Sequence, residues 1–399
     1  MKWREVILNE ICTSQYGYTA SAEEQNVGLK FLRITDIVPE TINWLSVPYC
    51  AIDEEDIKKY KLEKGDIVIA RTGNTTGYAK LIRDDVDAVF ASYLIRLRVN
   101  PLIANPQYIG RLIESKIYKS FVNSIKGGSA QGNANAKMLT LFKFKIPHLP
   151  IQQKIADILS KYDDLIENNR RRIELLERSA RLLYKEWFVR LRFPGHEHTP
   201  IIDGIPEGWE RLKLSDLCEV KRGASPRPIN NYMGGTVPWF KIGDATKSES
   251  PFIFETVELV TEDGARQSVF LEPLSLILSN SATCGIPFFT GLHGCIHDGW
   301  LCFKNFQGIS KYFLYCYLLF KQRELLQSVG DGSTQKNLNT KIVEKLDIII
   351  PNNGVILKLF DNFVNPAFTM ILTLAIQNMK LRKARDILLP KLMNGEIEV

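Results

Sequence analysis

The sequence predicts an α+β fold in which two similar mixed α/β domains are joined by two long antiparallel coiled-coil helices with pseudo-twofold symmetry. Three observations predict it. The chain of 399 residues is longer than a single hydrophobic core usually supports. Its two halves share several segments in the same order. Each half then ends in a long stretch of helix-forming residues.

The internal repeat is the most specific of these observations. The segment WREVILNEIC at Trp3 returns as WERLKLSDLC at Trp209, an offset of 206 residues. FLRITDI returns as WFKIGDA, and GDIVIARTGNTTG returns as PLSLILSNSATCG, both at an offset of 208. GGSAQGNAN at Gly127 returns as DGSTQKNLN at Asp331, at an offset of 204. This constant order and nearly constant spacing favour duplication over chance similarity between segments that form common strands and turns.

Each copy reads as a mixture of short strands and helices. The runs from Asp66 to Ala70 and from Leu274 to Leu278 are apolar and bounded by turn residues, which predicts strands. Helical stretches are expected at 108–125 and 312–329, between the strands.

A long helix is predicted after Pro150, because the following residues contain no glycine or proline as far as Val189. From Ile151 to Val189 it would span roughly 58 Å at about 1.5 Å per residue, so it needs a long partner. A second helix between Pro366 and Leu389 supplies one, and Pro366 is expected to end or kink any helix that begins earlier. The predicted seam of the first helix consists of Ile155, Ile158, Tyr162, Leu165, Asn169, Leu176 and Leu183.

Asn169 is the polar residue of this seam, and the offset of 204 places Thr373 opposite it. A buried polar residue at such a position fixes the register of paired helices. The alternative is that Asn169 faces solvent. The predicted organisation is a first domain at 1–150, a central spacer helix at 151–192, a linker at 193–208, a second domain at 209–352, and a distal spacer helix with a C-terminal tail at 353–399.

Composition narrows the class of protein. A formal charge of +6 and a pI near 8.8 permit contact with nucleic acid without requiring it. The start of the chain has no apolar signal segment, and no uninterrupted apolar run of about 18 residues occurs. The seven cysteines are odd in number and lack a C-x-x-C pair. We therefore expect a cytoplasmic protein with reduced thiols and no membrane contact.

Polar loops that follow apolar strands are the candidate binding site. Arginine and lysine pair with guanine or phosphate, and asparagine and glutamine pair with adenine, while glycine permits close backbone approach. The alternative for each residue is a turn whose amides only cap neighbouring backbone. The candidate DNA-binding residues are Arg71, Thr72, Asn74, Thr75, Ser129, Gln131, Asn133, Lys221, Arg222, Arg227, Asn280, Ser333, Gln335, Lys336 and Asn337.

Four segments carry a resemblance to a known family. They are the repeated domain starts GIPEGWERLKLSDL and KWREVILNEI, the helix start IPHLPIQQKIADIL, and the C-terminal LRKARDILLPKLMNGEIEV. In this order the chain resembles the specificity subunit of type I restriction-modification systems over essentially its full length. It departs from the pattern at PNNGVILKLF, where a glutamine-containing helix start is expected, at Pro366, and in lacking a Pro-Gly lead before Trp3.

The resemblance implies two target recognition domains that each read one part of a bipartite site in double-stranded DNA. It implies two modification (methyltransferase) subunits and restriction/translocase subunits as partners. S-adenosylmethionine, ATP and Mg²⁺ are then expected in those partners, and no cofactor in this chain.

Signs of catalysis or metal binding in the chain are weak. NPQY at Asn105 lacks the second proline of an adenine methyltransferase motif, and Pro106 is better read as the start of a helix. The HGCIH segment from His293 to His297 offers three ligands of a zinc site but no fourth. No G-x-x-x-x-G-K-S/T loop is present. We predict no catalytic and no metal-binding residues; a diverged DNA methyltransferase and a protein-binding scaffold without DNA contact are the alternatives.

Overall fold

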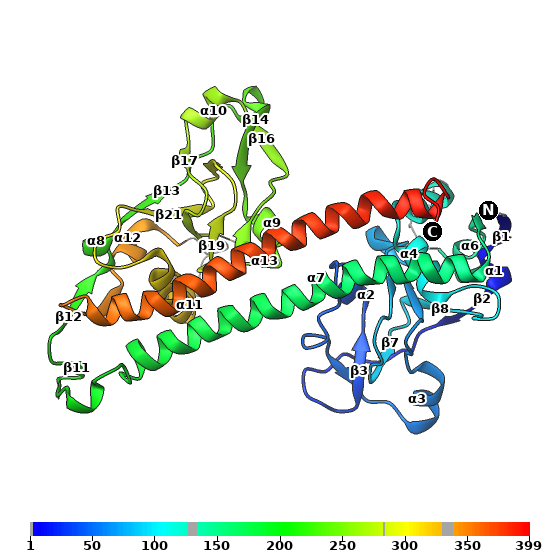
Figure 1. The fold of residues 1–399 in the computed structure, drawn as a ribbon, viewed down its shortest axis with the longest axis horizontal. Coiled ribbons are helices and arrows are strands. Elements are labelled where there is room, and N and C mark those ends of the chain that lie inside the picture. Colours follow the sequence, from blue (N-terminus) through cyan, green and yellow to red (C-terminus); the bar gives the residue numbers. More distant parts are fainter. Residues whose placement is uncertain (1–2, 127–133, 282–283, 329–337) are drawn as a thin grey trace. The chain divides into compact units, whose positions relative to one another are not determined.

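The computed structural model describes residues 3–126, 134–281, 284–328 and 338–399 (Figure 1). Its chain divides into two compact units, which we call unit 1 and unit 2. Unit 1 comprises Met1–Asp164 and Arg382–Val399, and unit 2 comprises Leu165–Leu381.

Unit 1 contains three sheets around buried apolar strands, of which β5 is buried at every position. The sheets are β2 (Cys12–Tyr16), β8 (Leu94–Val99), β5 (Ile67–Ala70) and β6 (Ala79–Leu81) in that order; β4 (Tyr49–Cys50), β3 (Leu29–Leu32) and β7 (Ala88–Phe90); and β1 (Arg4–Ile7) with β9 (Lys143–Ile146). The short helices are α1 (Leu8–Ile11), α2 (Ile34–Ile37), α3 (Glu54–Tyr60), the 3-10 turn η1 (Gly73–Thr75), α4 (Pro106–Glu114), α5 (Lys116–Lys126) and α6 (Ala136–Leu139).

Unit 2 is built in the same way. Its sheets are β13 (Glu219–Arg222), β21 (Trp300–Lys304), β18 (Leu276–Ser279), β19 (Pro287–Thr290) and β15 (Phe252–Ile253) in that order; β16 (Glu258–Val260), β14 (Met233–Phe240), β20 (Gly294–Ile296) and β17 (Val269–Leu271); β12 (Trp209–Lys213) with β22 (Asp347–Pro351); and β10 (Ile201–Ile202) with β11 (Ile205–Pro206). The shorter helices are η3 (His196–His198), α8 (Leu214–Leu217), η4 (Ile229–Asn231), α9 (Ile242–Ala245), α10 (Glu262–Arg266), α11 (Lys311–Ser328) and α12 (Thr340–Glu344).

Equivalent residues perform the same local task in both units. β3 pairs in parallel with β7, and β14 pairs in parallel with β20. The helix that follows begins with a reciprocal capping box, Arg33 with Asp36 in unit 1 and Lys241 with Asp244 in unit 2, at the predicted offset of 208. The predicted α+β class and the duplication are therefore confirmed.

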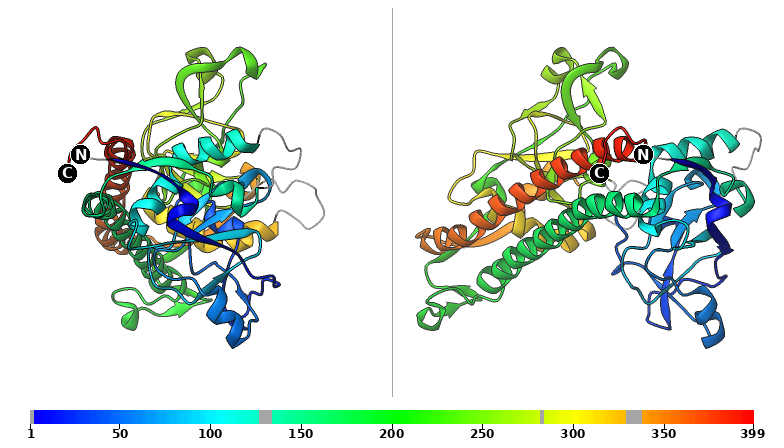
Figure 2. Two further views of the ribbon diagram at one scale, coloured as in Figure 1. Left: turned by 90° about the vertical axis from the view of Figure 1, so that its right-hand side faces the viewer. Right: turned by 45° about the vertical axis from the view of Figure 1, so that its right-hand side comes forward.

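Two long helices contribute segments to both units. α7 (Leu149–Tyr184) continues into the π-helical turn η2 (Lys185–Val189), and α13 spans Val355–Met393. In unit 1 the start of α7 lies beside the end of α13, as Figures 1 and 2 show, and an ion pair of 2.9 Å joins Asp163 to Arg385. In unit 2 the rings of Trp187 and Phe360 are 6.1 Å apart. The paired segments are antiparallel in each unit.

Two expectations about these helices are wrong. The second helix neither starts nor ends at Pro366, since α13 begins at Val355 and continues through the proline. Pro366 lies on the exposed side, where water can satisfy the carbonyl that proline leaves without a donor, while Val364 and Phe368 pack in the core. Leu165 is not a seam residue, because it is 54% exposed and the neighbouring Ile166 is buried.

Apart from Leu165, the predicted seam residues are buried or partly buried, and neighbouring residues of α7 complete the buried face. Among the predicted residues Ile155 and Asn169 are buried, and Ile158, Tyr162, Leu176 and Leu183 are partly buried. The other buried apolar residues of α7 are Ala156, Leu159, Ile166, Ile173, Ala180 and Tyr184.

Asn169 is 6% exposed, so the solvent-facing alternative is wrong. Its amide Nδ2 donates to Oδ1 of Asn378 at 3.0 Å, and Nδ2 of Asn378 donates to the carbonyl of Ile166 at 3.1 Å. The predicted partner Thr373 instead donates from its hydroxyl to its own helix at Thr369, because antiparallel pairing puts Asn378 opposite Asn169.

α13 is long and apolar enough to span a membrane by length and composition, with a mean hydropathy of 1.4 in its most apolar window. This is weak support for a membrane span, since core helices pass the same test. Phe360, Phe368 and Ile371 of this helix are fully buried in the core of unit 2.

Candidate nucleic-acid interface

A short connection between two consecutive core strands offers an equivalent backbone carbonyl in each unit. In unit 1, Ser92 lies between β7 and β8, and in unit 2, Asp298 lies between β20 and β21. Both connections are crossed closely by a glycine. A Cβ on Gly17 would lie 2.2 Å from the carbonyl oxygen of Ala91, and one on Gly223 would lie 2.3 Å from that of His297. Only glycine fits this approach without a shift of backbone.

In unit 1 this connection holds the guanidinium of Arg71, which directly follows β5. Arg71 Nε donates to the carbonyl of Ser92 at 3.0 Å. The guanidinium carbon lies 5.1 Å from the ring centroid of Tyr16 and 6.0 Å from that of Tyr93. Tyr16 and Tyr93 are 44% and 58% exposed, so the cation lies close to two aromatic side chains that solvent reaches.

In unit 2 the same connection holds a different arginine. Arg222, at the end of β13, donates from Nε to the carbonyl of Asp298 at 2.9 Å. Asn280 donates from Nδ2 to that carbonyl, also at 2.9 Å. Arg222 is exposed, whereas Asn280 is 1% exposed, so its amide faces protein rather than solvent.

Backbone hydrogen bonds define which residues of the two units correspond. The carbonyl of Arg71 accepts from the amide of Ala134 at 2.9 Å, and the carbonyl of Asn280 accepts from that of Leu338 at 2.7 Å. Arg71 therefore corresponds to Asn280, at an offset of 209 rather than the 208 inferred for this strand from sequence. Ala134 and Leu338 are the first described residues after the gaps at 127–133 and 329–337.

Seven of the candidate DNA-binding residues lie outside the described residues: Ser129, Gln131, Asn133, Ser333, Gln335, Lys336 and Asn337.

The remaining candidate residues are either exposed or bonded to a near neighbour in the sequence. Asn74 is exposed in η1, and the hydroxyl of Thr75 donates to the carbonyl of Thr72 at 3.3 Å. Lys221 is exposed and forms an ion pair of 2.8 Å with Glu219. The backbone amide of Arg227 donates to the side chain of Gln267, and its own side chain is exposed.

Sequence reasoning missed Tyr16 and Tyr93. Tyr16 ends β2, and its hydroxyl accepts from the amide of Ala136 at 3.1 Å, which ties it to the segment after the first gap. An aromatic residue at the end of a strand more often packs in a core than on a surface. No signal in the sequence marks these two as neighbours of Arg71, because all three come from different strands and connections.

The segments considered for catalysis or metal binding have structural roles. Asn105 accepts from the amide of Tyr108 at 2.9 Å and caps α4, in which Pro106 is the first residue. Cys295 is buried, and His297 packs on Trp239 with a ring distance of 5.1 Å. No group of three metal-binding side chains occurs among the described residues.

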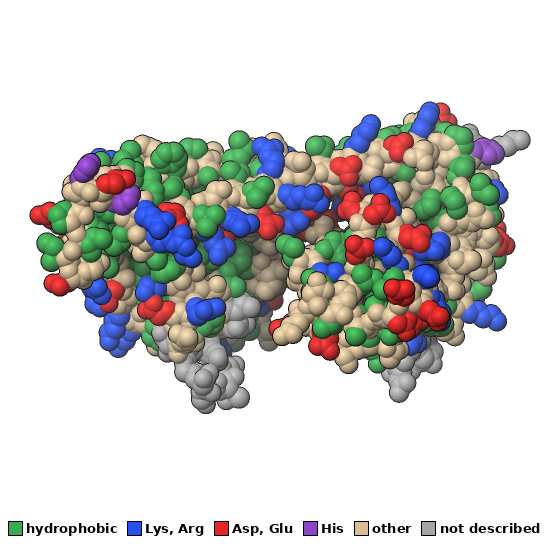
Figure 3. Space-filling view, turned by 90° about the horizontal axis from the view of Figure 1, so that it is seen from below, with side chains coloured by type: hydrophobic (Ala, Val, Ile, Leu, Met, Phe, Trp, Pro, Cys, Tyr) green, Lys and Arg blue, Asp and Glu red, His purple; other side chains and the backbone are tan. Residues whose placement is uncertain are grey.

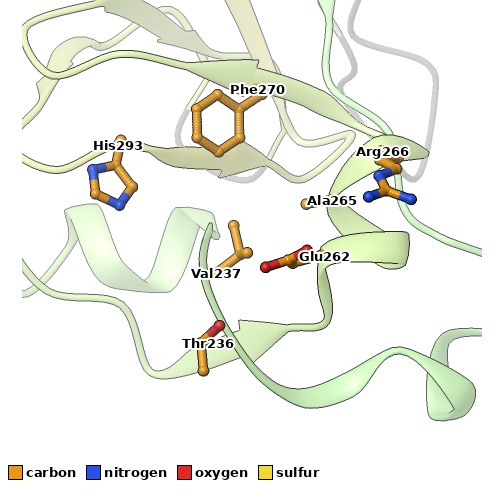
Figure 4. Close-up of a pocket in the computed structure, with 7 residues that line it drawn as sticks. All are labelled: Thr236, Val237, Glu262, Ala265, Arg266, Phe270 and His293. Atoms are coloured by element: carbon orange, nitrogen blue, oxygen red, sulfur yellow. The ribbon is translucent and has the colours of Figure 1, made fainter.

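His293 packs instead on Phe270, with nearly parallel rings 6.2 Å apart. These two side chains line an open hollow of about 480 Å³ in unit 2. Figure 4 shows them on one side of the hollow, with Glu262 and Arg266 of α10 on another. Arg266 forms an ion pair of 3.1 Å with Asp263, so its charge is already compensated.

Charge is unevenly distributed on the surface. Figure 3 shows basic side chains gathered over unit 2 in its left part. In this unit α7 and the segment after it expose several cations while contributing few carboxylates. The exposed cations are Arg171, Arg172, Arg178, Arg181, Lys185, Arg190 and Arg192.

A duplicated α+β unit with an arginine anchored at the end of a core strand has the groups that a nucleic-acid recognition protein uses. Residues 1–178 and 206–377 match the type I restriction modification DNA specificity domain. The chain belongs to this family and is a non-catalytic DNA specificity subunit.

Two relatives agree with this membership, and one solved structure shares the fold. The chain is 31% identical to the type I restriction enzyme MjaIX specificity subunit of Methanocaldococcus jannaschii, over 73% of this chain and 69% of the relative. It is 25% identical to the HindI specificity subunit of Haemophilus influenzae, over 85% and 88% of the two chains. The crystal structure of the S subunit from M. genitalium has the same fold, with a TM-score of 0.60, 15% identity, and coverage of 98% of this chain and 96% of that one.

Proposed function

We propose that this chain recognises a bipartite site in double-stranded DNA, with one half read by each unit. The observation that carries the proposal is that both units anchor an arginine at the equivalent strand connection. In each unit a guanidinium is anchored to the carbonyl of Ser92 or Asp298, and the residue after the core strand, Arg71 or Asn280, bonds through its backbone to Ala134 or Leu338. Such groups suit phosphates and base edges.

The partners follow from the family. We propose that the chain positions two methyltransferase subunits and, in the complete assembly, restriction/translocase subunits in the cytoplasm. S-adenosylmethionine, ATP and Mg²⁺ then belong to these partners.

An exchange of one recognition unit tests the proposal. Residues 209–350 are replaced by the equivalent segment of another specificity subunit, and the methylated sites are mapped in the assembled complex. We expect only one half of the bipartite site to change, because each unit has its own cores. The reciprocal exchange of residues 4–146 is the control and should change the other half. Alteration of both halves by either exchange would contradict one reader per unit.

A second measurement separates this function from methyl transfer by the chain itself. The isolated chain is titrated with S-adenosylmethionine in a calorimeter, and no heat of binding is expected. Micromolar binding without partners would instead support a methyltransferase.

A further inference from the structure

The two units fix a guanidinium against the same backbone carbonyl, but they take it from different strands. Ser92 and Asp298 are equivalent by the backbone pairing that follows them. The amide of Arg71 donates to the carbonyl of Tyr93, and the amide of Asn280 donates to the carbonyl of Gly299. In unit 1 the arginine follows β5, and in unit 2 it ends β13.

The residues at the two contributing positions are exchanged between the units. The position of Arg71 carries Asn280 in unit 2, and the position of Arg222 carries Tyr16 in unit 1. Simple inheritance from a duplicated ancestor would place the same residue at the same position. Here, different strands supply a guanidinium to the equivalent carbonyl in the two units. This is expected if the position of the guanidinium matters for a shared ligand.

The anchoring leaves the end of each guanidinium available. Nε is used by the carbonyl, at 3.0 Å for Arg71 and 2.9 Å for Arg222. Within the described residues neither arginine forms an ion pair or a hydrogen bond through its two terminal nitrogens. Each fork is therefore oriented and positively charged without a carboxylate partner. In unit 1 the rings of Tyr16 and Tyr93 further restrict its plane.

We propose that Arg71 and Arg222 each donate a bidentate pair of hydrogen bonds to O6 and N7 of a guanine in the major groove. Each half of the DNA target then contains a guanine at the corresponding place. This inference rests on the proposed function and deepens it. The alternative ligand with paired acceptor oxygens is a backbone phosphate. Guanine is favoured because a fork fixed through Nε presents two donors in one plane, whereas a phosphate contact needs no such restriction.

The test uses the full chain assembled with its methyltransferase subunits. Bound sites are selected from a random duplex library with the wild type, with Arg71→Ala and with Arg222→Ala. Each variant should lose the preference for guanine at one position of one half, by roughly 5- to 150-fold, and keep the other half unchanged. Arg71→Lys should fail to restore the preference, since lysine lacks the planar fork. Lys213→Ala, which removes an exposed cation of unit 2 that pairs with Asp347, is the control and should leave every position unchanged.

A phosphate contact predicts a different result and would overturn the inference. Affinity would then fall equally for all sequences, and the slope of log K against log salt would decrease by about 1. A second measurement uses the wild-type protein and changes the DNA instead. Each guanine of the target is replaced in turn by 7-deazaguanine, which lacks the N7 acceptor, and binding is measured. One position in each half should weaken, and no weakening in either half would overturn the inference. Absence of any bipartite motif with the wild type would instead contradict the proposed function.

Discussion

At the scale of single residues, close backbone approach and buried charge set the strictest requirements. Gly17 and Gly223 lie against the connection that anchors the arginines, and neither has a positive φ, so space rather than conformation selects glycine. In unit 1 a carboxylate on α7, Asp163, lies among arginines from three other segments. The glycines hold a neighbouring strand against the connection that anchors the arginines. Asp163 joins α7 to other segments of unit 1.

Gly223→Ala is expected to destabilise the chain by about 1–3 kcal/mol, because the added Cβ would lie 2.3 Å from the carbonyl oxygen of His297. Chemical denaturation measures this change. Gly243→Ala is the control in the same unit, since its Cβ would meet nothing within 4 Å. Equal stability of the two variants would show that the connection is not tightly packed.

Asp163 is 7% exposed and forms ion pairs with Arg111 and, at 2.9 Å, with Arg385. Burial opposes ionisation of this carboxyl, but Arg83, Arg111 and Arg385 outweigh burial and lower its pKa. A lowered folded-state pKa stabilises the protein above the pKa of an unfolded aspartate, near 4, and this contribution is lost as pH falls below it.

Asp163→Asn should therefore lower the free energy of unfolding by about 3–5 kcal/mol near pH 7, since it leaves the buried guanidinium of Arg111 without its carboxylate partner. The difference from wild type should shrink as the pH is lowered through 4. Asp164→Asn changes the exposed neighbour and should have little effect at either pH. A difference for Asp163→Asn that does not depend on pH would exclude the ionised carboxylate as its cause.

At the scale of elements, the paired long helices show where sequence patterns suffice and where they do not. A continuous helix from about Ile151 was predictable because no glycine or proline interrupts it, and α7 begins at Leu149. The exact buried face of α7 was not predictable from the sequence. Apolar residues at spacings of 3 and 4 form two adjacent stripes, and packing against α13 decides which residues are buried. The partner of Asn169 depends on the same register.

Asn169→Leu is expected to destabilise unit 2 by about 1–3 kcal/mol, because Asn378 would lose its donor in a buried site. The double variant Asn169→Leu with Asn378→Leu removes both polar groups and should recover most of this loss. Thermal unfolding of the single and double variants measures the coupling. Additive effects would show that the two amides do not interact.

At the scale of the whole molecule, the division between units falls within both long helices, at Asp164 and Leu165 in α7 and at Leu381 and Arg382 in α13. These positions are where the helices can be lengthened without removing a contact inside either unit.

Insertion of seven helix-forming residues at both positions should lengthen the unspecified gap of the DNA site by about three base pairs. Seven residues add roughly 10 Å of helix, and base pairs are about 3.4 Å apart. Mapping of methylated sites measures the gap. Insertion into only one helix is the control and should impair assembly rather than change the gap. An unchanged gap in an active complex with both insertions would show that the helices do not set the spacing.

The sequence by itself determined the duplication, the α+β class, the helices and the family, because these depend on local pattern and on the order of segments. It also identified Arg71 and Arg222 as candidate DNA-binding residues in polar segments. Tertiary structure alone decided that both guanidiniums meet equivalent carbonyls, since Ser92 and Asp298 are distant in sequence from the arginines they anchor. It also decided that Tyr16 and Tyr93 flank Arg71, that α13 passes through Pro366, and that Asn378 opposes Asn169. The physical reason is that pairing between distant segments depends on packing and hydrogen bonding across the whole unit, which no local pattern contains.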